Sequence, residues 1–471
     1  MHLSRLTFPL ACLLAVVAAS VAIAHSDAEK PRFVAKTGVD EGRCDDPASP
    51  CATIGYALRQ TGKGSQVLVA SGAYEISDPA DIFYIVSGTV DVRGGFSAAN
   101  AYRLTSNAPT TLIGVPREYR AQLASRGFSI VADTKSYGDE VLEETEKFLG
   151  MYAASKTSLG AAPCVGGQSA GLDCLNTELL SRLALSSVSA SPGSAADVWG
   201  FTDLNTHREY TIVGFSTGTG VFDVSDPENP VEIGFIDGQA TTWRDIKVYQ
   251  FFNAAENRWN AYAYVVADST TDGLYVIDLT ELPHRVFRSG AFTNRFFSAH
   301  NVFVTNIDYG TGLALQHAAP TLIVAGSNND GGRFRSFSLA NPANPQEIAV
   351  ASGANLYMHD AASTVITDSR RNQCQNETPT YCELLFDFNE GSVVTWDITV
   401  PASPVLLSEI PYAAVGYTHS GWVSEDNQYL FVHDELDEGR TVANTTVRVF
   451  SLADVSTPSF VSSWVSNNIT T

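Results

Sequence analysis

The sequence predicts an all-β protein, a β-propeller of four-stranded blades preceded by a small β-rich module. The main observation is a repeated phrase: an apolar strand closes on Asp or Ser, and a short turn with proline leads into a second apolar strand. The closing residues lie about 54 to 60 positions apart, somewhat above the ~40 to 50 of common blade repeats: Asp223, Asp278, Ser338, Asp397 and Ser451. Each repeat holds about four short strands, as a blade requires, and lacks the 3.6-residue period of a helical solenoid. We therefore expect five blades, at residues 197–238, 239–293, 294–351, 352–411 and 412–466.

The first 24 residues have the pattern of a secretory signal. Arg5 precedes an apolar run at residues 10–24, and small residues at its end place cleavage before His25. No later stretch approaches the ~20 apolar residues of a membrane-spanning helix. We expect a secreted or extracellular protein, with association with a cell surface as one option and without a membrane span.

Residues 32–115 predict a small first unit. A strand at 33–35 leads into a short amphipathic helix at 52–58, and a second strand follows at 67–74. Further short strands are expected at 82–86, 89–92 and 111–112, between glycines. The phrases CATI (51–54), VLVASGAY (67–74) and GGF (94–96) resemble the capping start of secreted right-handed parallel β-helices, so we expect a small β-helix-like module.

Residues 116–196 predict a helical and linker segment with a disulfide loop. Helical patterning covers 117–126 and 140–152, and a Ser- and Ala-rich stretch from 186 to 196 indicates a linker before the propeller at 197–466. Apart from Cys12, the cysteines of the chain form three close pairs. An even count in an exported chain indicates disulfides rather than zinc ligands: Cys44 with Cys51, Cys164 with Cys174, and Cys374 with Cys382.

The formal net charge of −22 excludes some partners. Nucleic acid and anionic membranes would be repelled by such a surface. Acidic side chains on strand edges also keep a β-rich protein from pairing edge to edge, so solubility alone accounts for most of this charge. We expect the partner to be an extracellular protein or a glycan.

An ordered series of motifs identifies a family resemblance from about Cys164 to the C-terminus. The series is DVWGFTD (197–203), REY (208–210), WRDIKVY (243–249), AHN (299–301), MHD (358–360), HSGW (419–422) and HDELDE (433–438). It resembles the choice-of-anchor B proteins, which carry LVIVD-type propeller repeats. The resemblance implies a secreted or surface-displayed propeller. It leaves ring closure and surface attachment open.

Aligning the blades places polar residues at one equivalent position, at the start of the innermost strands, where they would converge on the mouth of the central channel. These candidate ligand-binding residues are Arg244, Asp245, His300, Asn301, His359, Asp360 and His419, followed by Ser420; His433, Asp434, Glu435, Asp437 and Glu438 follow the second strand of the last blade. Imidazole with carboxylate suits a zinc-like ion, through His300, His359 and His419, and an acidic cluster suits calcium. The alternative is that these residues hydrogen-bond neighbouring blades and hold the ring in register. Aromatic residues at the blade starts either fill the wedges between blades or bind sugar.

Two functions follow. The first is a secreted or cell-surface, non-enzymatic scaffold that binds a protein, glycan or metal through the mouth. The second is a metal-dependent hydrolase, in which the three histidines with Asp245, Asp360 and Glu435 hold a metal that lowers the pKa of a bound water. Ring nitrogens that share a common point would favour the metal, and hydrogen bonds to the backbone of adjacent blades would favour the scaffold.

Overall fold

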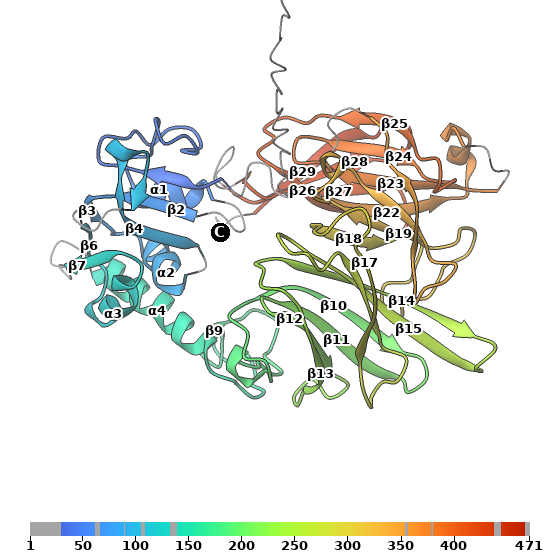
Figure 1. The fold of residues 1–471 in the computed structure, drawn as a ribbon, viewed down its shortest axis with the longest axis horizontal. Coiled ribbons are helices and arrows are strands. Elements are labelled where there is room, and N and C mark those ends of the chain that lie inside the picture. The colour runs from blue at the N-terminus through green and yellow to red at the C-terminus, as the bar shows by residue number, and fades with distance from the viewer. Residues whose placement is uncertain are drawn as a thin grey trace, which may run out of the picture.

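The fold is described from a computed structural model, which covers residues 30–61, 66–88, 90–104, 109–131, 139–353, 357–376, 378, 380–437 and 444–466. The expected signal at 1–24 and Glu438 lie outside the described residues. Figure 1 shows a small N-terminal module, joined by a helix to a larger array of sheets. Among the helices in the described ranges, none is long and apolar enough to cross a membrane.

The N-terminal module combines two short sheets with helices. One sheet has the order β1 (Arg32–Val34), β2 (Gln66–Ala70), β4 (Asp91–Ser97), β5 (Arg103–Leu104); the other has the order β3 (Gly72–Glu75), β6 (Thr110–Ile113), β7 (Phe128–Val131). All pairs are parallel except β4 with β5. The helices are α1 (Ile54–Arg59), α2 (Pro79–Ser87) and α3 (Arg120–Ala124). Their apolar faces form one core with the strands.

The strand expected at residues 82–86 is wrong, because this segment lies in α2. The Asp78 side chain accepts a hydrogen bond from the Ala80 N–H, and Pro79 occupies the first turn, where its missing N–H costs nothing. Gly88 ends the helix in the left-handed conformation, at φ 73°. Ile82, Ile85 and Val86 are buried together on one helical face.

The segment between module and propeller contains α4 (Asp139–Ser155) and the short hairpin β8 (Gln168–Ser169) and β9 (Leu172–Asp173). A disulfide between Cys164 and Cys174 closes this hairpin loop. The other two expected disulfides, Cys44–Cys51 and Cys374–Cys382, are also present. The cysteine pairing predicted from local spacing is therefore confirmed.

Five four-stranded antiparallel sheets follow, each with its strands in sequence order. The first blade is β10 (Ala195–Asp203), β11 (Arg208–Phe215), β12 (Gly218–Asp223), β13 (Val231–Asp237); the second is β14 (Arg244–Asn253), β15 (Arg258–Ala267), β16 (Leu274–Asp278), β17 (Phe287–Phe292). The third is β18 (Asn301–Val304), β19 (Thr321–Ala325), β20 (Arg335–Ser338), β21 (Gln346–Val350); the fourth is β22 (Asp360–Ile366), β23 (Cys382–Phe388), β24 (Val393–Asp397), β25 (Val405–Ile410). The fifth is β26 (Thr418–Val423), β27 (Tyr429–Asp434), β28 (Thr446–Ser451), β29 (Ser459–Val465). The predicted all-β propeller architecture is confirmed.

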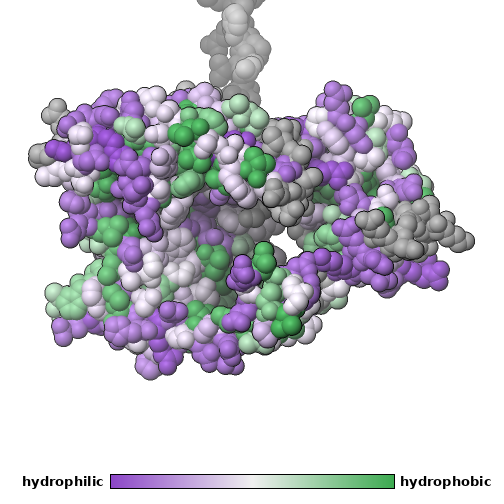
Figure 2. All heavy atoms as spheres, turned by 180° about the vertical axis from the view of Figure 1, so that it is seen from behind, coloured by the Kyte–Doolittle hydropathy of each residue, from purple (hydrophilic) through white to green (hydrophobic). Residues whose placement is uncertain are grey.

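The innermost strands pack side by side in chain order, β10 on β14, β14 on β18, β18 on β22 and β22 on β26. Among the described strands, no comparable packing joins β26 to β10. Apolar side chains fill the wedges between blades: Trp396, for example, is fully buried with its ring 5.2 Å from that of Phe334. Polar residues cover much of the face shown in Figure 2, in keeping with the net charge of −22.

A long connection between β18 and β19, residues 305–320, crosses the end of the ring where the innermost strands finish; we call it the crossing loop. Its Gly310 carbonyl accepts from the Thr202 N–H of the first blade at 2.9 Å, and its Gly312 carbonyl accepts from the Gln250 N–H of the second at 2.8 Å. The Tyr309 ring lies 5.7 Å from Trp199 on β10 and 4.8 Å from Trp422 on β26. The crossing loop thus links the first and fifth blades.

Candidate functional site

The structure brings the three predicted histidines together at the mouth, the end of the ring where the innermost strands start. The ring of His359 lies 4.3 Å from that of His300 and 4.5 Å from that of His419, and Trp243 stacks on His300 at 5.4 Å. His300 and His359 are buried, whereas His419 is partly exposed. We call His300, His359 and His419 the histidine row.

Hydrogen bonds fix the orientation of the His300 and His359 rings in this row. The Nδ1 of His359 donates to the His419 carbonyl of the next blade at 2.9 Å, so this nitrogen carries a proton. The Nδ1 of His300 bonds the Asp268 carboxylate at 2.8 Å. The Nε2 of His419 faces Glu435, at 3.9 Å from its Oε2. The backbone bond of His359 is the arrangement that favours a structural role.

The histidine row does not form a three-ligand metal site among the described residues. The one group of three whose ligand atoms all lie within 4.8 Å of one another there is Cys374, Cys382 and Asp397. Those two cysteines form a disulfide, so they offer no thiolate to a metal.

At each of the four successive blade junctions, a side chain near the start of an innermost strand forms a hydrogen bond to the backbone of the next blade. Asp197 accepts from the Ile246 N–H at 3.3 Å, and Asp245 accepts from the Val302 N–H at 2.7 Å. Asn301 donates to the His359 carbonyl at 3.0 Å, and the fourth junction has the bond from His359 to His419. These side chains connect each sheet to the next.

Arg244 lies between the first two blades. Its guanidinium donates to the Phe215 carbonyl at 3.2 Å, the Tyr275 hydroxyl at 2.9 Å and the Gln239 carbonyl at 2.8 Å. The side chain is fully buried by these partners. It therefore contributes to the junction between the blades.

A buried group of charges, which we call the inner cluster, lies on three blades: Asp197, Asp245, Lys247 and Asp360. The Lys247 ammonium lies 2.7 Å from Asp245 and 3.6 Å from Asp197, and sits over the Trp199 ring. Burial raises the pKa of Asp245, and the nearby charge of Asp197 raises it further, against the opposing effect of the Lys247 ammonium. Burial also raises the pKa of Asp360, which accepts from its own Ala361 N–H and not from the next blade.

The acidic residues after the second strand of the fifth blade have mainly internal partners. Asp434 accepts from the N–H groups of Gly416 and Tyr417, each at 2.7 Å. Asp437 forms a bidentate pair with Arg448, at 3.0 and 2.7 Å. His433 lies on the exposed side of β27, and its pKa is lowered by burial of its ring and by His419. Among the described members of this group, Glu435 forms an ion-pair contact with the histidine row, through His419.

A pocket at the opposite end of the ring was not anticipated from the sequence. It has a volume of about 730 Å³ and lies between the crossing loop, the strand β22 and the segment that follows β26. Its polar and aromatic lining includes Asn306, Asp308, Tyr309, Thr364, Trp422 and Glu425. We call it the loop pocket. The sequence signal that could have indicated it is the unusual length of the connection between the first two strands of the third blade.

Comparisons with known proteins leave the family open. No family model and no curated protein matches this sequence. Similar solved structures include a functionally unknown protein from Desulfotomaculum acetoxidans (TM-score 0.38, 14% identity, 58% of this chain and 71% of that one). The periplasmic gluconolactonase of Pseudomonas aeruginosa has a TM-score of 0.39 at 10% identity, over 66% of this chain and 83% of that one. A candidate 6-phosphogluconolactonase from Bacteroides uniformis has a TM-score of 0.37 at 9% identity, over 57% of this chain and 71% of that one. Likenesses this weak carry no argument about activity, so the propeller assignment rests on the five sheets of this chain.

Proposed function

We propose that this protein is an exported, non-enzymatic binding scaffold of the choice-of-anchor B type, whose propeller presents its mouth to an extracellular protein or glycan. The observation that carries the proposal is the hydrogen bond from His359 Nδ1 to the His419 carbonyl. A histidine ring that is hydrogen-bonded to the backbone of the next blade holds the two blades together. Three disulfides support an oxidising, extracellular setting.

The other polar residues around the mouth also connect neighbouring blades. Asp197, Asp245 and Asn301 each have a hydrogen bond to a neighbouring blade, so the polar residues that would attract a metal are already in use. A buried polar group that keeps its partner costs little, whereas one that loses it costs about 1–3 kcal/mol. The partly exposed side chains of His419 and Glu435 are available to a partner at the mouth.

The second function, a metal-dependent hydrolase, requires three protein ligands around one ion, of zinc-like or calcium type. His419 and Glu435 supply two that face each other at 3.9 Å. Among the described residues, no third histidine, cysteine or carboxylate supplies a ligand atom that lies within 4.8 Å of both. The scaffold is therefore the better-supported proposal.

The test compares metal content and stability in three proteins: wild type, the double variant His359→Ala with His419→Ala, and the control His284→Ala, an exposed histidine far along the second blade. We expect less than one ion per chain in all three by mass spectrometry. The double variant should lose about 2 kcal/mol of unfolding free energy, because it removes a buried hydrogen bond and ring packing. One equivalent of metal in wild type that is lost from the double variant alone would establish the metal site instead.

A further inference from the structure

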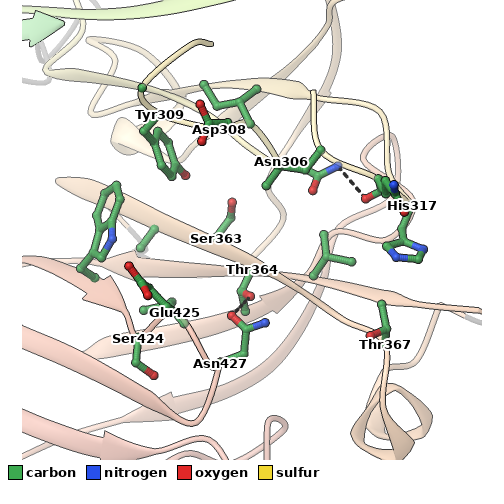
Figure 3. Close-up of a pocket in the computed structure, with 18 residues that line it drawn as sticks. Asn306, Asp308, Tyr309, His317, Ser363, Thr364, Thr367, Ser424, Glu425 and Asn427 are labelled. Atoms are coloured by element: carbon green, nitrogen blue, oxygen red, sulfur yellow. Dashed lines mark hydrogen bonds between the residues drawn. The ribbon is translucent and has the colours of Figure 1, made fainter. Parts of the chain in front are cut away.

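We propose that the loop pocket binds an organic cation, an ammonium or guanidinium group carried by a small molecule or by a side chain of a peptide. The site lies at the opposite end of the ring from the mouth, so it goes beyond the proposed function and does not depend on the histidine row. Figure 3 shows Tyr309 and Asp308 on one side of the space, Ser363 and Thr364 on β22, and Glu425 and Asn427 opposite the crossing loop.

Two aromatic rings form one wall of the pocket. Tyr309 and Trp422 have centroids 4.8 Å apart and planes inclined at 57°. Tyr309 is partly buried, with its ring against Trp199, so it is held in place. Trp422 is 47% exposed and presents its ring to the pocket. Two inclined aromatic faces are the arrangement that attracts a cation through its charge.

The charges of the lining have a single sign. Asp308 and Glu425 are both exposed carboxylates, and the described lining residues include one histidine, His317, but neither Lys nor Arg. Asp308 Oδ1 accepts from the Thr311 N–H and hydroxyl, at 2.8 and 2.6 Å, which fixes this carboxylate in the crossing loop. The chain as a whole carries −22, so its field adds to the attraction.

The combination selects among ligand chemistries. An anion would be repelled by two carboxylates that have no counter-charge. An alkane would cover the polar groups of the lining without forming hydrogen bonds to them, which is unfavourable. A neutral sugar could stack on Trp422 and donate hydroxyl hydrogen bonds to Asp308 and Glu425, but it carries no charge that would offset theirs. An organic cation gains from both features at once, since its alkyl groups contact the rings and its charge meets the carboxylates.

The test is calorimetric titration of the full chain with choline, and with its neutral carbon isostere 3,3-dimethyl-1-butanol. We expect choline to bind and the isostere not to bind. The variants are Trp422→Leu, Trp422→Phe and Glu425→Gln, and the matched control is Glu228→Gln, an exposed glutamate on the first blade. Affinity for choline should fall roughly tenfold in Trp422→Leu and less in Trp422→Phe, since the indole ring attracts cations best. It should fall about threefold in Glu425→Gln, and salt should reduce it in wild type.

A lysine-rich peptide and free choline, titrated in parallel, distinguish the two sources of the cation: tighter binding of the peptide assigns the pocket to a side chain, and tighter binding of choline to a small molecule. Equal binding of choline and its isostere would overturn the proposal, as would binding of an oligosaccharide such as maltotriose without choline. Unchanged choline affinity in both Trp422→Phe and Glu425→Gln, with circular dichroism like that of wild type, would also overturn it. The double variant of the histidine row should bind choline normally, so the two proposals fail separately.

Discussion

A buried glutamate between the third and fourth blades should make the stability of the propeller depend on pH. Glu383, on β23, is 1% exposed, and in the described part of the chain its Oε1 has no hydrogen-bond partner. Burial raises its pKa from 4.5 to about 7, against a smaller opposing effect of a hydrogen bond from Thr305. Each pKa unit corresponds to about 1.4 kcal/mol, so ionising this group in the folded state costs about 3 kcal/mol.

The sign follows from the protons bound in each state. Between pH 4.5 and 7 the unfolded chain has released this proton, while the folded chain keeps it. The free energy of unfolding therefore falls as the pH rises through this window, and the stabilisation that the protonated Glu383 provides is fully lost above pH 7. The substitution Glu383→Gln keeps the shape of the side chain and removes the ionisation. Between pH 4.5 and pH 8, we expect the unfolding free energy of the variant to rise relative to that of wild type by up to about 3 kcal/mol.

The assay is urea unfolding of both proteins at several pH values from 4.5 to 8, with the difference in unfolding free energy plotted against pH. Other carboxyl groups titrate equally in both proteins and cancel in the difference. The control Glu228→Gln, at an exposed position, should give a difference that does not change with pH. A flat difference for Glu383→Gln would refute the reasoning, because it would mean that Glu383 ionises in the folded protein as easily as in water.

Two further predictions concern the fifth blade and the crossing loop. Arg448→Met leaves the buried Asp437 carboxylate without its bidentate partner, so it should lower the free energy of unfolding, measured in urea, by about 3 kcal/mol. Adding Asp437→Asn to this variant should recover part of that loss. If the losses of the two substitutions simply add, the pair does not interact. Gly312→Ala should cost about 1–2 kcal/mol in thermal unfolding, because Gly312 has φ +72° and an added Cβ would lie 3.2 Å from the Gln250 nitrogen. An unchanged melting temperature would show that the crossing loop adapts freely.

The blades could be predicted because their signals are local. The third strand of each blade is apolar and closes on Asp or Ser before a turn with proline, so the period is visible without tertiary information. The prediction of a strand at 82–86 was wrong because a short apolar run does not distinguish a strand from a helix. The distinguishing residues were Asp78, Pro79 and Gly88, which cap α2 at both ends.

The histidine row was predictable in position but not in chemistry. Alignment of the repeats placed His300, His359 and His419 side by side, since equivalent positions of adjacent blades are neighbours in space. Whether a ring nitrogen meets a metal or a carbonyl depends on fractions of an ångström between blades, which no residue pattern encodes. The loop pocket depends on contacts from Gly310 and Gly312 to other blades, far away in sequence. Apart from the unusual length of the connection, such contacts leave no local signal.

The inner cluster and the loop pocket show how this protein distributes its negative charge. Inside the ring, burial raises the pKa of Asp245 and Asp360 and so favours their neutral forms, while the Lys247 ammonium holds the pKa of Asp197 low against the opposing effect of burial. The interior then approaches one ion pair with little net charge, as desolvation demands. In the loop pocket, two exposed carboxylates stand beside an exposed indole. A cation attracted by the whole acidic surface therefore finds its strongest complement at the pocket, where charge and aromatic faces coincide, and not along the neutralised axis of the ring.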